Sequence, residues 1–540
     1  LINLGVIARN ENVGNLYTMK FIRSGILRIF KHAAGNTLAF IALLVGKHPG
    51  QKPRNTVHKN TSGKLASRKH VVTDRDLLVD DLIHDSLIDS LVVSAKDNEA
   101  VALACYSLCY RFVEDGSAGG HINGLDLGST ADQRAAAVEK YGSEENAYKM
   151  ISEELLANGI NTYWGGDAGF FEQNKLIQAV SIGGISQYMY NELGLKAAAG
   201  GHDKYAHNNT MNVFDPDFAA FCERIYTDVA APYIGSDRVL GFYSDNELPA
   251  NTDMLYRYLT IDPTEPMNAF SYAAAWTWLI RATNNPNPTV SDITPALSEE
   301  FKAFIFDTYF TVVTNALDKV GCGDYMYMGT RIHNENETSE GYLRAAGRHL
   351  DLISVNLYGG MEPPADTIEG IYKYSGRPFI VTEFFAKAND AVDMNGYALG
   401  NQTNAGWNVE TQKDRAIHFE NYTLLLIESR SCVGWTWYRF RDNDQPLYQD
   451  EVGNIYKPFD ISGAMPGAYQ NVESGAIIDG PSLAPSLTTV YKGEGDLSNV
   501  GSNKGIYDNK MNMYTELVGS YKKIHDNVFA LIDYFDDIAG

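Results

Sequence analysis

Beyond residue 119, short apolar runs alternate with longer amphipathic segments, and this alternation limits the possible folds more than any other feature. Each short run has the length of a buried strand, and each longer segment has the apolar spacing of a helix packed on one face. Strand followed by helix, repeated along a chain, is typical of a parallel sheet covered by helices. The repeats predict an α/β fold, and eight of them predict a (β/α)8 TIM barrel.

Eight apolar runs are predicted to be the barrel strands. They are Ile122–Leu127, Ile160–Trp164, Leu195–Ala199, Arg238–Tyr243, Tyr325–Gly329, Leu350–Leu357, Pro378–Thr382 and Cys432–Tyr438. Helices are expected at about 143–158, from Asp215-Pro216 onward, and at about Tyr514–Phe535. Ser143 and Asp215 are predicted N-caps, because short polar side chains accept hydrogen bonds from the first helical N–H groups. A helical insertion carrying Trp276 and Trp278 is expected after the fourth strand.

Residues 1–118 lack this pattern, and they differ in charge. Residues 1–70 hold 12 Lys/Arg and one acid, a net +11, so the other 470 residues carry −23 − 11 = −34. We therefore predict an N-terminal segment, 1–118, of leader or linker character and partly disordered, and a catalytic barrel over 119–540. Within the first segment, basic residues precede a short apolar run, Leu38–Val45, which resembles a signal peptide. This pattern gives the expectation of a secreted, periplasmic or outer-surface protein.

The acidic body also limits the function. Nucleic-acid binding requires a basic surface, so nucleic acid is not an expected partner. No apolar stretch reaches the roughly 18 residues of a membrane span. The five cysteines have no metal-site spacing, and the chain shows no phosphate loop or nucleotide fingerprint. The sequence predicts an enzyme that needs no cofactor and no metal and acts on a neutral, hydrated substrate.

Two glutamates are predicted at the same end of the barrel. Glu247 follows the fourth strand, and Glu383 follows the seventh. The carboxyl ends of the strands form the active face of such barrels. Hydrolysis of a glycosidic bond needs one carboxylic acid and one carboxylate. A single glutamate at a strand end is more often an ion-pair partner, but two of them, on strands four and seven, predict a catalytic pair.

Several motifs resemble those of known enzymes. They are Gly241-Phe-Tyr-Ser-Asp-Asn-Glu-Leu-Pro249, Val381-Thr-Glu-Phe-Phe-Ala-Lys387, Cys432-Val-Gly-Trp-Thr-Trp-Tyr438 continuing to Asp442-Asn-Asp444, Thr411-Gln-Lys-Asp-Arg415, Ser502-Asn-Lys-Gly505 and Leu531-Ile-Asp-Tyr-Phe-Asp536. The pair Asn246-Glu247 with Glu383 resembles the acid/base and nucleophile of clan A glycoside hydrolases. The wider set resembles the agarases and porphyranases of glycoside hydrolase families 86 and 50. The likeness covers roughly residues 119–540.

This resemblance implies a retaining endo-hydrolase of β-linked galactan, of the agarose or porphyran type. Glu383 would be the nucleophile and Glu247 the acid/base, with carboxyl groups about 5–5.5 Å apart. Asn246 is expected to bind a substrate hydroxyl. The other predicted substrate-binding residues are Trp164, Arg331, His333, Tyr358, Lys387, Trp407, Trp435 and Trp437.

These residues have different expected roles. Tyr358 and His333 are predicted donors to Glu383 or to a sugar hydroxyl, although a packed tyrosine and a surface histidine are the ordinary alternatives. Trp435 or Trp437 would be the stacking platform under the sugar, and Trp164 and Trp407 would be subsite walls. Arg331, Asn356 and Lys387 are plausible hydroxyl or sulfate contacts.

Two alternative functions remain at this point. The first is a clan A glycosidase acting on another β-linked polysaccharide, with the same catalytic pair and different subsites. The second is a catalytically inactive carbohydrate-binding barrel, which would be expected to lack or displace one carboxylate.

Overall fold

A computed structural model describes residues 120–128, 130–173, 176–195, 210–333, 337–402, 405–459, 467–479, 486–493 and 500–539. The predictions for residues 1–118, including the leader-like segment, lie outside these ranges. No helix in the described part of the chain is long and apolar enough to cross a membrane.

The core of the molecule is a closed barrel of eight parallel strands. In the order of their hydrogen-bonded neighbours they are β5 (Met326–Tyr327), β4 (Val239–Tyr243), β3 (Ile177–Ser181), β2 (Ile160–Gly166), β1 (Gly120–Leu125), β10 (Cys432–Trp437), β7 (Phe379–Phe384) and β6 (Ile353–Asn356). The two end strands meet at a parallel bridge between Ile332, just after β5, and Val355 in β6. The Ile332 N–H donates to Ser354 O at 2.9 Å, and the Asn356 N–H donates to Ile332 O at 2.8 Å. The predicted (β/α)8 barrel is therefore confirmed.

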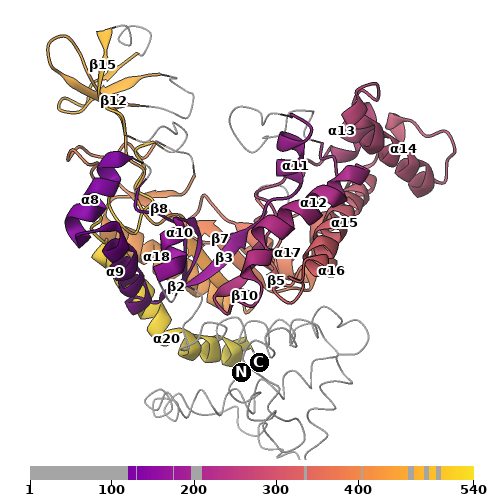
Figure 1. The fold of residues 1–540 in the computed structure, drawn as a ribbon, viewed down its shortest axis with the longest axis horizontal. Helices are drawn as coiled ribbons and strands as arrows, with labels where there is room; N and C mark the ends of the chain where they lie inside the picture. The colour runs from indigo at the N-terminus through magenta and orange to yellow at the C-terminus, as the bar shows by residue number, and fades with distance from the viewer. Residues whose placement is uncertain are drawn as a thin grey trace, which may run out of the picture.

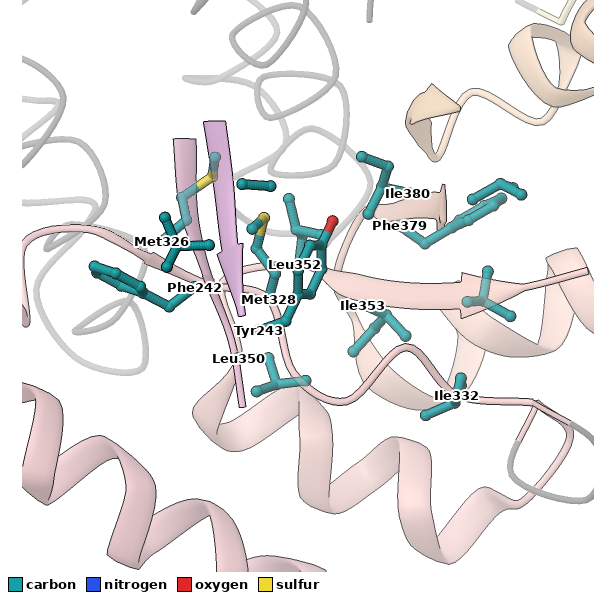
Figure 2. Close-up of a cluster of buried hydrophobic side chains, with 14 of the residues drawn as sticks. Phe242, Tyr243, Met326, Met328, Ile332, Leu350, Leu352, Ile353, Phe379 and Ile380 are labelled. Carbon is teal, nitrogen blue, oxygen red and sulfur yellow. The ribbon is translucent and has the colours of Figure 1, made fainter. Parts of the chain in front are cut away.

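A cluster of buried apolar side chains packs where the two end strands of the sheet, β5 and β6, meet. Figure 2 shows Phe242, Met326, Met328, Leu352 and Phe379 gathered between β4, β5, β6 and β7, and all five are buried. Burying one side chain of this size contributes about 1.5–3 kcal/mol. This packing offsets the short hydrogen-bonded ladder of β5, which has only two residues.

Helices cover the outside of the barrel (Figure 1). They are α8 (Ala131–Tyr141), α9 (Glu144–Ala157), α10 (Ala168–Gln173), α12 (Pro216–Val229), α16 (Glu340–His349), α17 (Ala365–Ser375), α18 (Gln412–Glu428) and α20 (Thr515–Ala539), and the short α11 (Ile185–Asn191) lies at the carboxyl end of the strands. Ser143 caps α9 by accepting the Asn146 N–H at 3.1 Å, and Asp215 caps α12 by accepting the Asp217 N–H at 3.0 Å. Both predicted N-caps are confirmed.

The third strand lies earlier in the chain than the sequence pattern predicts. It is β3, Ile177–Ser181, whereas the prediction placed it near Leu195–Ala199. Of that range only Leu195 is described, and it follows α11 outside any strand. The prediction was wrong because β3 contains Gln178 and Ser181, which interrupt the apolar run expected of a strand buried on both faces.

Two insertions stand on the barrel at the carboxyl end of the strands. The first follows β4 and contains α13 (Met254–Thr260) and α14 (Ala269–Thr283), whereas the next helix, α15 (Pro295–Lys319), packs against α12 and α16 in the ring of helices around the barrel. The second follows β10 and is an antiparallel sheet of β11 (Leu447–Gln449), β12 (Ile455–Pro458), β13 (Tyr469–Asn471), β14 (Ile477–Ile478) and β15 (Thr488–Tyr491). Figure 1 shows α13 and α14 on one side of this end and the sheet on the other. A two-stranded ladder, β8 (Ala386–Ala388) with β9 (Trp407–Val409), follows β7.

The antiparallel sheet was not predicted. Its strands have two to four residues each, which is too short for an apolar/polar alternation to be recognised. The helical insertion after the fourth strand was predicted, and Trp276 and Trp278 lie in α14 as expected.

Candidate active site

Glu247 and Glu383 both lie at the carboxyl end of the barrel strands. Glu383 is the fifth residue of β7, and its Cα pairs with that of Asn356 in β6. Glu247 comes four residues after the end of β4. Both are nearly buried, with 7% of Glu383 and 8% of Glu247 exposed. The two carboxylates are therefore held inside the protein at the same end of the barrel.

The carboxylate of Glu383 is bound on both oxygens. The Arg331 guanidinium forms a short ion pair with Oε1, and the Tyr358 hydroxyl donates a short hydrogen bond to Oε2. Burial raises the pKa of Glu383, the charges of Arg331 and Lys504 lower it, and the charge of Glu247 raises it. Burial dominates, so the pKa lies above its ordinary value. The interaction with Glu247 shows that the two carboxylates are close enough to affect each other.

Glu247 is held in an unusual backbone conformation. Its φ is 48°, in the left-handed region, and its N–H donates to Thr330 O at 2.9 Å. Its side-chain Oε1 accepts a hydrogen bond from Asn356 Nδ2 at 2.8 Å. A left-handed residue other than glycine costs roughly 1–2 kcal/mol. Such a cost is typical of functional sites, where the surrounding structure fixes the side-chain direction.

Arg331 is the central cation of this site. It too is left-handed, with φ 51°, and only 1% of it is exposed. Besides Glu383, it donates to Asn246 Oδ1 at 3.1 Å and to Thr382 O at 3.3 Å. Its guanidinium carbon lies 3.6 Å from the ring centroid of Trp164. The two terminal NH2 groups of Arg331 thus bind protein groups, and the hydroxyl or sulfate contact expected from the sequence stays a prediction.

His333 contacts two residues that bind the catalytic candidates, Asn356 and Tyr358. Its Nδ1 is 2.8 Å from Glu337 Oε1 and 3.0 Å from Asn356 O, and its ring packs edge-on against Tyr358. Burial lowers the pKa of His333, but the bond and charge of Glu337 and the charge of Glu247 together raise it above the ordinary value. This position places His333 beside both Tyr358 and Asn356, which contact the catalytic candidates.

The four predicted tryptophans differ in exposure. Trp407, on β9, is 40% exposed, and Trp164 is half-buried beneath Arg331. Trp435 and Trp437 are 1% and 0% exposed. The Trp437 indole packs against Phe384 and donates to Lys504 O at 2.6 Å. This placement favours a packing role for the two indoles of β10, since a sugar needs access to the ring on which it stacks, and their predicted stacking role stays a prediction.

Two lysines lie near the site. Lys387, in β8, was predicted; its Nζ is 3.4 Å from Asn401 O, and burial lowers its pKa to about 8. Lys504 was not predicted as a site residue, although its motif carries part of the resemblance. Its Nζ lies 5.1 Å from the ring centroids of both Phe385 and Tyr438, and it is 1% exposed. It places a positive charge between the ends of β7 and β10.

A third buried acid, Asp245, supports the segment before Glu247. Asp245 accepts hydrogen bonds from Ile185 N at 2.9 Å and Tyr309 Oη at 2.6 Å. Burial raises its pKa to about 7, against the opposing effect of these donors. Asp245 thereby connects the chain after β4 to the start of α11.

In the part of the chain that the structure describes, no three His, Cys, Asp or Glu side chains gather as a metal site.

Comparison with solved structures identifies the fold. The chain is similar to a crystal structure of BpGH50, with a TM-score of 0.57 and 24% identity over 77% of this chain and 78% of that one. It is similar to PfGH50B, with a TM-score of 0.52 and 16% identity over 74% of this chain and 53% of that one.

A third similar structure is that of an exo-β-agarase, with a TM-score of 0.51 and 16% identity over 74% of this chain and 49% of that one. The chain thus spans about half the length of two of these three proteins. No family model matches the sequence, and no curated protein does. The chain therefore has the fold of the GH50 structures, a (β/α)8 barrel with Glu247 and Glu383 at its carboxyl end.

Proposed function

We propose that this chain is a retaining glycoside hydrolase that cleaves β-linked galactan of the agarose or porphyran type. One observation carries the proposal: two buried carboxylates at the active end of the barrel, each with its own donors. Glu383 has Arg331 and Tyr358, and Glu247 has Asn356. The inactive-barrel alternative expects one carboxylate to be missing or displaced, whereas both are held at this end.

The reaction has two steps. In the first, Glu383 attacks the anomeric carbon and forms an ester bond, while the glycosidic C–O bond breaks and Glu247 gives its proton to the leaving oxygen. In the second, Glu247 takes a proton from water, the water oxygen attacks the same carbon, and the ester bond breaks. Arg331 and Tyr358 hold Glu383 ionised for attack, which offsets the burial that favours its neutral form.

The galactan substrate rests on the motif resemblance and on the similarity to an exo-β-agarase. The motifs imply endo action, whereas that similar structure belongs to an exo enzyme. The two modes are separated by following polymer length: endo action lowers the viscosity of agarose early, and exo action releases small products while the viscosity stays high.

The stereochemistry of the first product tests the proposal. Agarose, porphyran, mannan and another β-galactan are incubated with the protein, and the hydrolysed substrate is followed by proton NMR. We expect the β-anomer of the new reducing end to appear first, followed by slow mutarotation. Early appearance of the α-anomer would exclude the double displacement, and turnover of mannan alone would replace galactan as the substrate class.

The charge of Lys504 gives a prediction for the pH dependence. In Lys504→Met the positive charge that lowers the pKa of Glu383 is lost, so this pKa rises further. Because attack needs the ionised carboxylate, the acidic limb of the kcat/KM profile is expected to move to higher pH. The control is Lys522→Met, which removes an exposed lysine of α20 paired with Asp526 and should leave the limb in place. An unmoved limb in Lys504→Met would show that Lys504 does not act on Glu383.

A further inference from the structure

Asn356 connects the two halves of the proposed catalytic pair. It is fully buried, at the end of β6, and its Cα pairs with that of Glu383. Its Nδ2 donates to Glu247 Oε1 at 2.8 Å, while its Oδ1 accepts from Thr382 Oγ1 at 2.7 Å. Its backbone oxygen lies 3.0 Å from His333 Nδ1. The side-chain amide of Asn356 therefore links Thr382, which precedes Glu383 in the chain, to Glu247.

The direction of this amide follows from the chemistry of its two neighbours. Oε1 of Glu247 accepts from Asn356 Nδ2, either as a carboxylate oxygen or as the carbonyl oxygen of the protonated acid, so the side of Asn356 that faces Glu247 is the NH2 group. The carbonyl side then faces Thr382, whose hydroxyl can donate to it. The Thr382 hydroxyl thereby stabilises the orientation that presents an N–H to Glu247.

This contact also distinguishes the two oxygens of Glu247. Oε1 accepts the Asn356 N–H and is the less favourable place for a proton, because a protonated oxygen would present a hydrogen to a donor. The transferable proton is therefore directed to Oε2. A general acid acts only when its proton lies within hydrogen-bond reach of the leaving oxygen.

We propose that Asn356 is a positioning residue, which with Thr382 orients Glu247 and assigns its transferable proton to Oε2. This inference rests on the proposed glycosidase function. Asn356 acts through Glu247 and not on the sugar itself. Its loss should therefore impair proton donation and leave the attack by Glu383 largely intact.

Leaving groups of different basicity separate these two effects. The probes are 2,4-dinitrophenyl and phenyl β-glycosides of the oligosaccharide that the wild-type protein releases. Dinitrophenolate leaves without a proton, whereas phenolate needs one. In Asn356→Ala we expect kcat/KM for the phenyl glycoside to fall about 100-fold, the low end of the general-acid contribution. The dinitrophenyl glycoside should lose about threefold or less, since kcat/KM reports the first bond cleavage.

Two further variants keep the test informative if Asn356→Ala folds poorly. Asn356→Asp keeps the shape but removes the N–H donor, and Thr382→Val removes the hydroxyl that orients the amide. Both should show the same dependence on the leaving group, and Thr382→Ser should restore the phenyl substrate. The control is Asn161→Ala in β2, a buried asparagine whose Oδ1 also accepts from a neighbouring threonine hydroxyl. It should change both substrates by the same factor.

Equal losses on both substrates in Asn356→Ala and Asn356→Asp would overturn the inference and leave Asn356 a structural residue. Failure of the wild-type protein to hydrolyse any glycoside would instead overturn the proposed function. The two failures are therefore distinguishable in one set of measurements.

Discussion

Replacing Glu383 by alanine is expected to lower kcat by about four orders of magnitude or more, which corresponds to about 5 kcal/mol of transition-state stabilisation. The substitution removes the atom that forms the covalent bond, together with the carboxylate that Arg331 and Tyr358 bind. Steady-state kinetics on the preferred polysaccharide measures the loss. Activity within tenfold of wild type would overturn the assigned role of Glu383.

Azide distinguishes the two glutamates. In Glu383→Ala, azide fits the space left by the carboxylate and attacks from its side, so partial rescue should give a glycosyl azide of inverted configuration. In Glu247→Ala, which keeps the nucleophile, azide attacks the glycosyl-enzyme and should give the retained configuration. NMR of the azide products reads the configuration directly. Identical configurations from the two variants would contradict the separate roles.

Arg331→Met is expected to have the second largest effect. Removing one partner of a buried ion pair costs about 3–5 kcal/mol, because the remaining charge stays buried without compensation. Glu383 would respond by a further rise of its pKa, since Arg331 is the largest opposing influence on it. The ionised fraction falls, so kcat/KM should drop by two or more decades, with the acidic limb at higher pH.

The stability change in Arg331→Met should depend on pH. Glu383 has a folded-state pKa above its unfolded value, so the native state binds more protons and loses stability as pH rises through that interval. Below the unfolded value, about 4.5, both states are protonated and this loss disappears. Denaturant unfolding near pH 7 and about one pH unit below 4.5 measures the difference. Equal destabilisation at both would contradict the assigned pairing.

A surface arginine provides the matched control for this experiment. Arg344→Met in α16 removes a 36% exposed guanidinium that pairs with Glu300 and Glu340. Exposed ion pairs contribute about 0–1 kcal/mol, so stability and the pH profile should change little. The contrast isolates the effect of burial and of contact with Glu383 from the loss of an arginine as such.

Much of the barrel could be predicted because several of its strands contain a run of buried apolar residues. Phe379-Ile-Val and Cys432-Val-Gly-Trp are runs of this kind. The third strand could not be located, because Gln178 and Ser181 leave only Ile177, Ala179 and Val180 as apolar residues in β3, which is too short and interrupted a run to be recognised. The antiparallel sheet was missed for another reason, namely that strands of two to four residues carry no measurable periodicity.

The two catalytic candidates could be predicted for the same reason as the strands. Glu247 and Glu383 each follow an apolar run that the sequence predicts to be a barrel strand. The partners of Glu383 are harder to infer, because Arg331 and Lys504 lie 52 and 121 positions away, 383 − 331 and 504 − 383, and meet it only through the register of the barrel. For Trp435 and Trp437, the alternation of a strand shows that they share a face, but not that the face is packed and inaccessible.

The two insertions lie outside the hydrogen-bonded barrel, one between β4 and β5 and the other between β10 and α20. The catalytic candidates, by contrast, are fixed by barrel strands and by bonds between neighbouring strand ends. During descent, insertions of this kind can lengthen, shrink or be exchanged while the barrel register stays unchanged. Related proteins with this architecture can therefore differ in substrate specificity through these insertions while the residues at the strand ends stay the same.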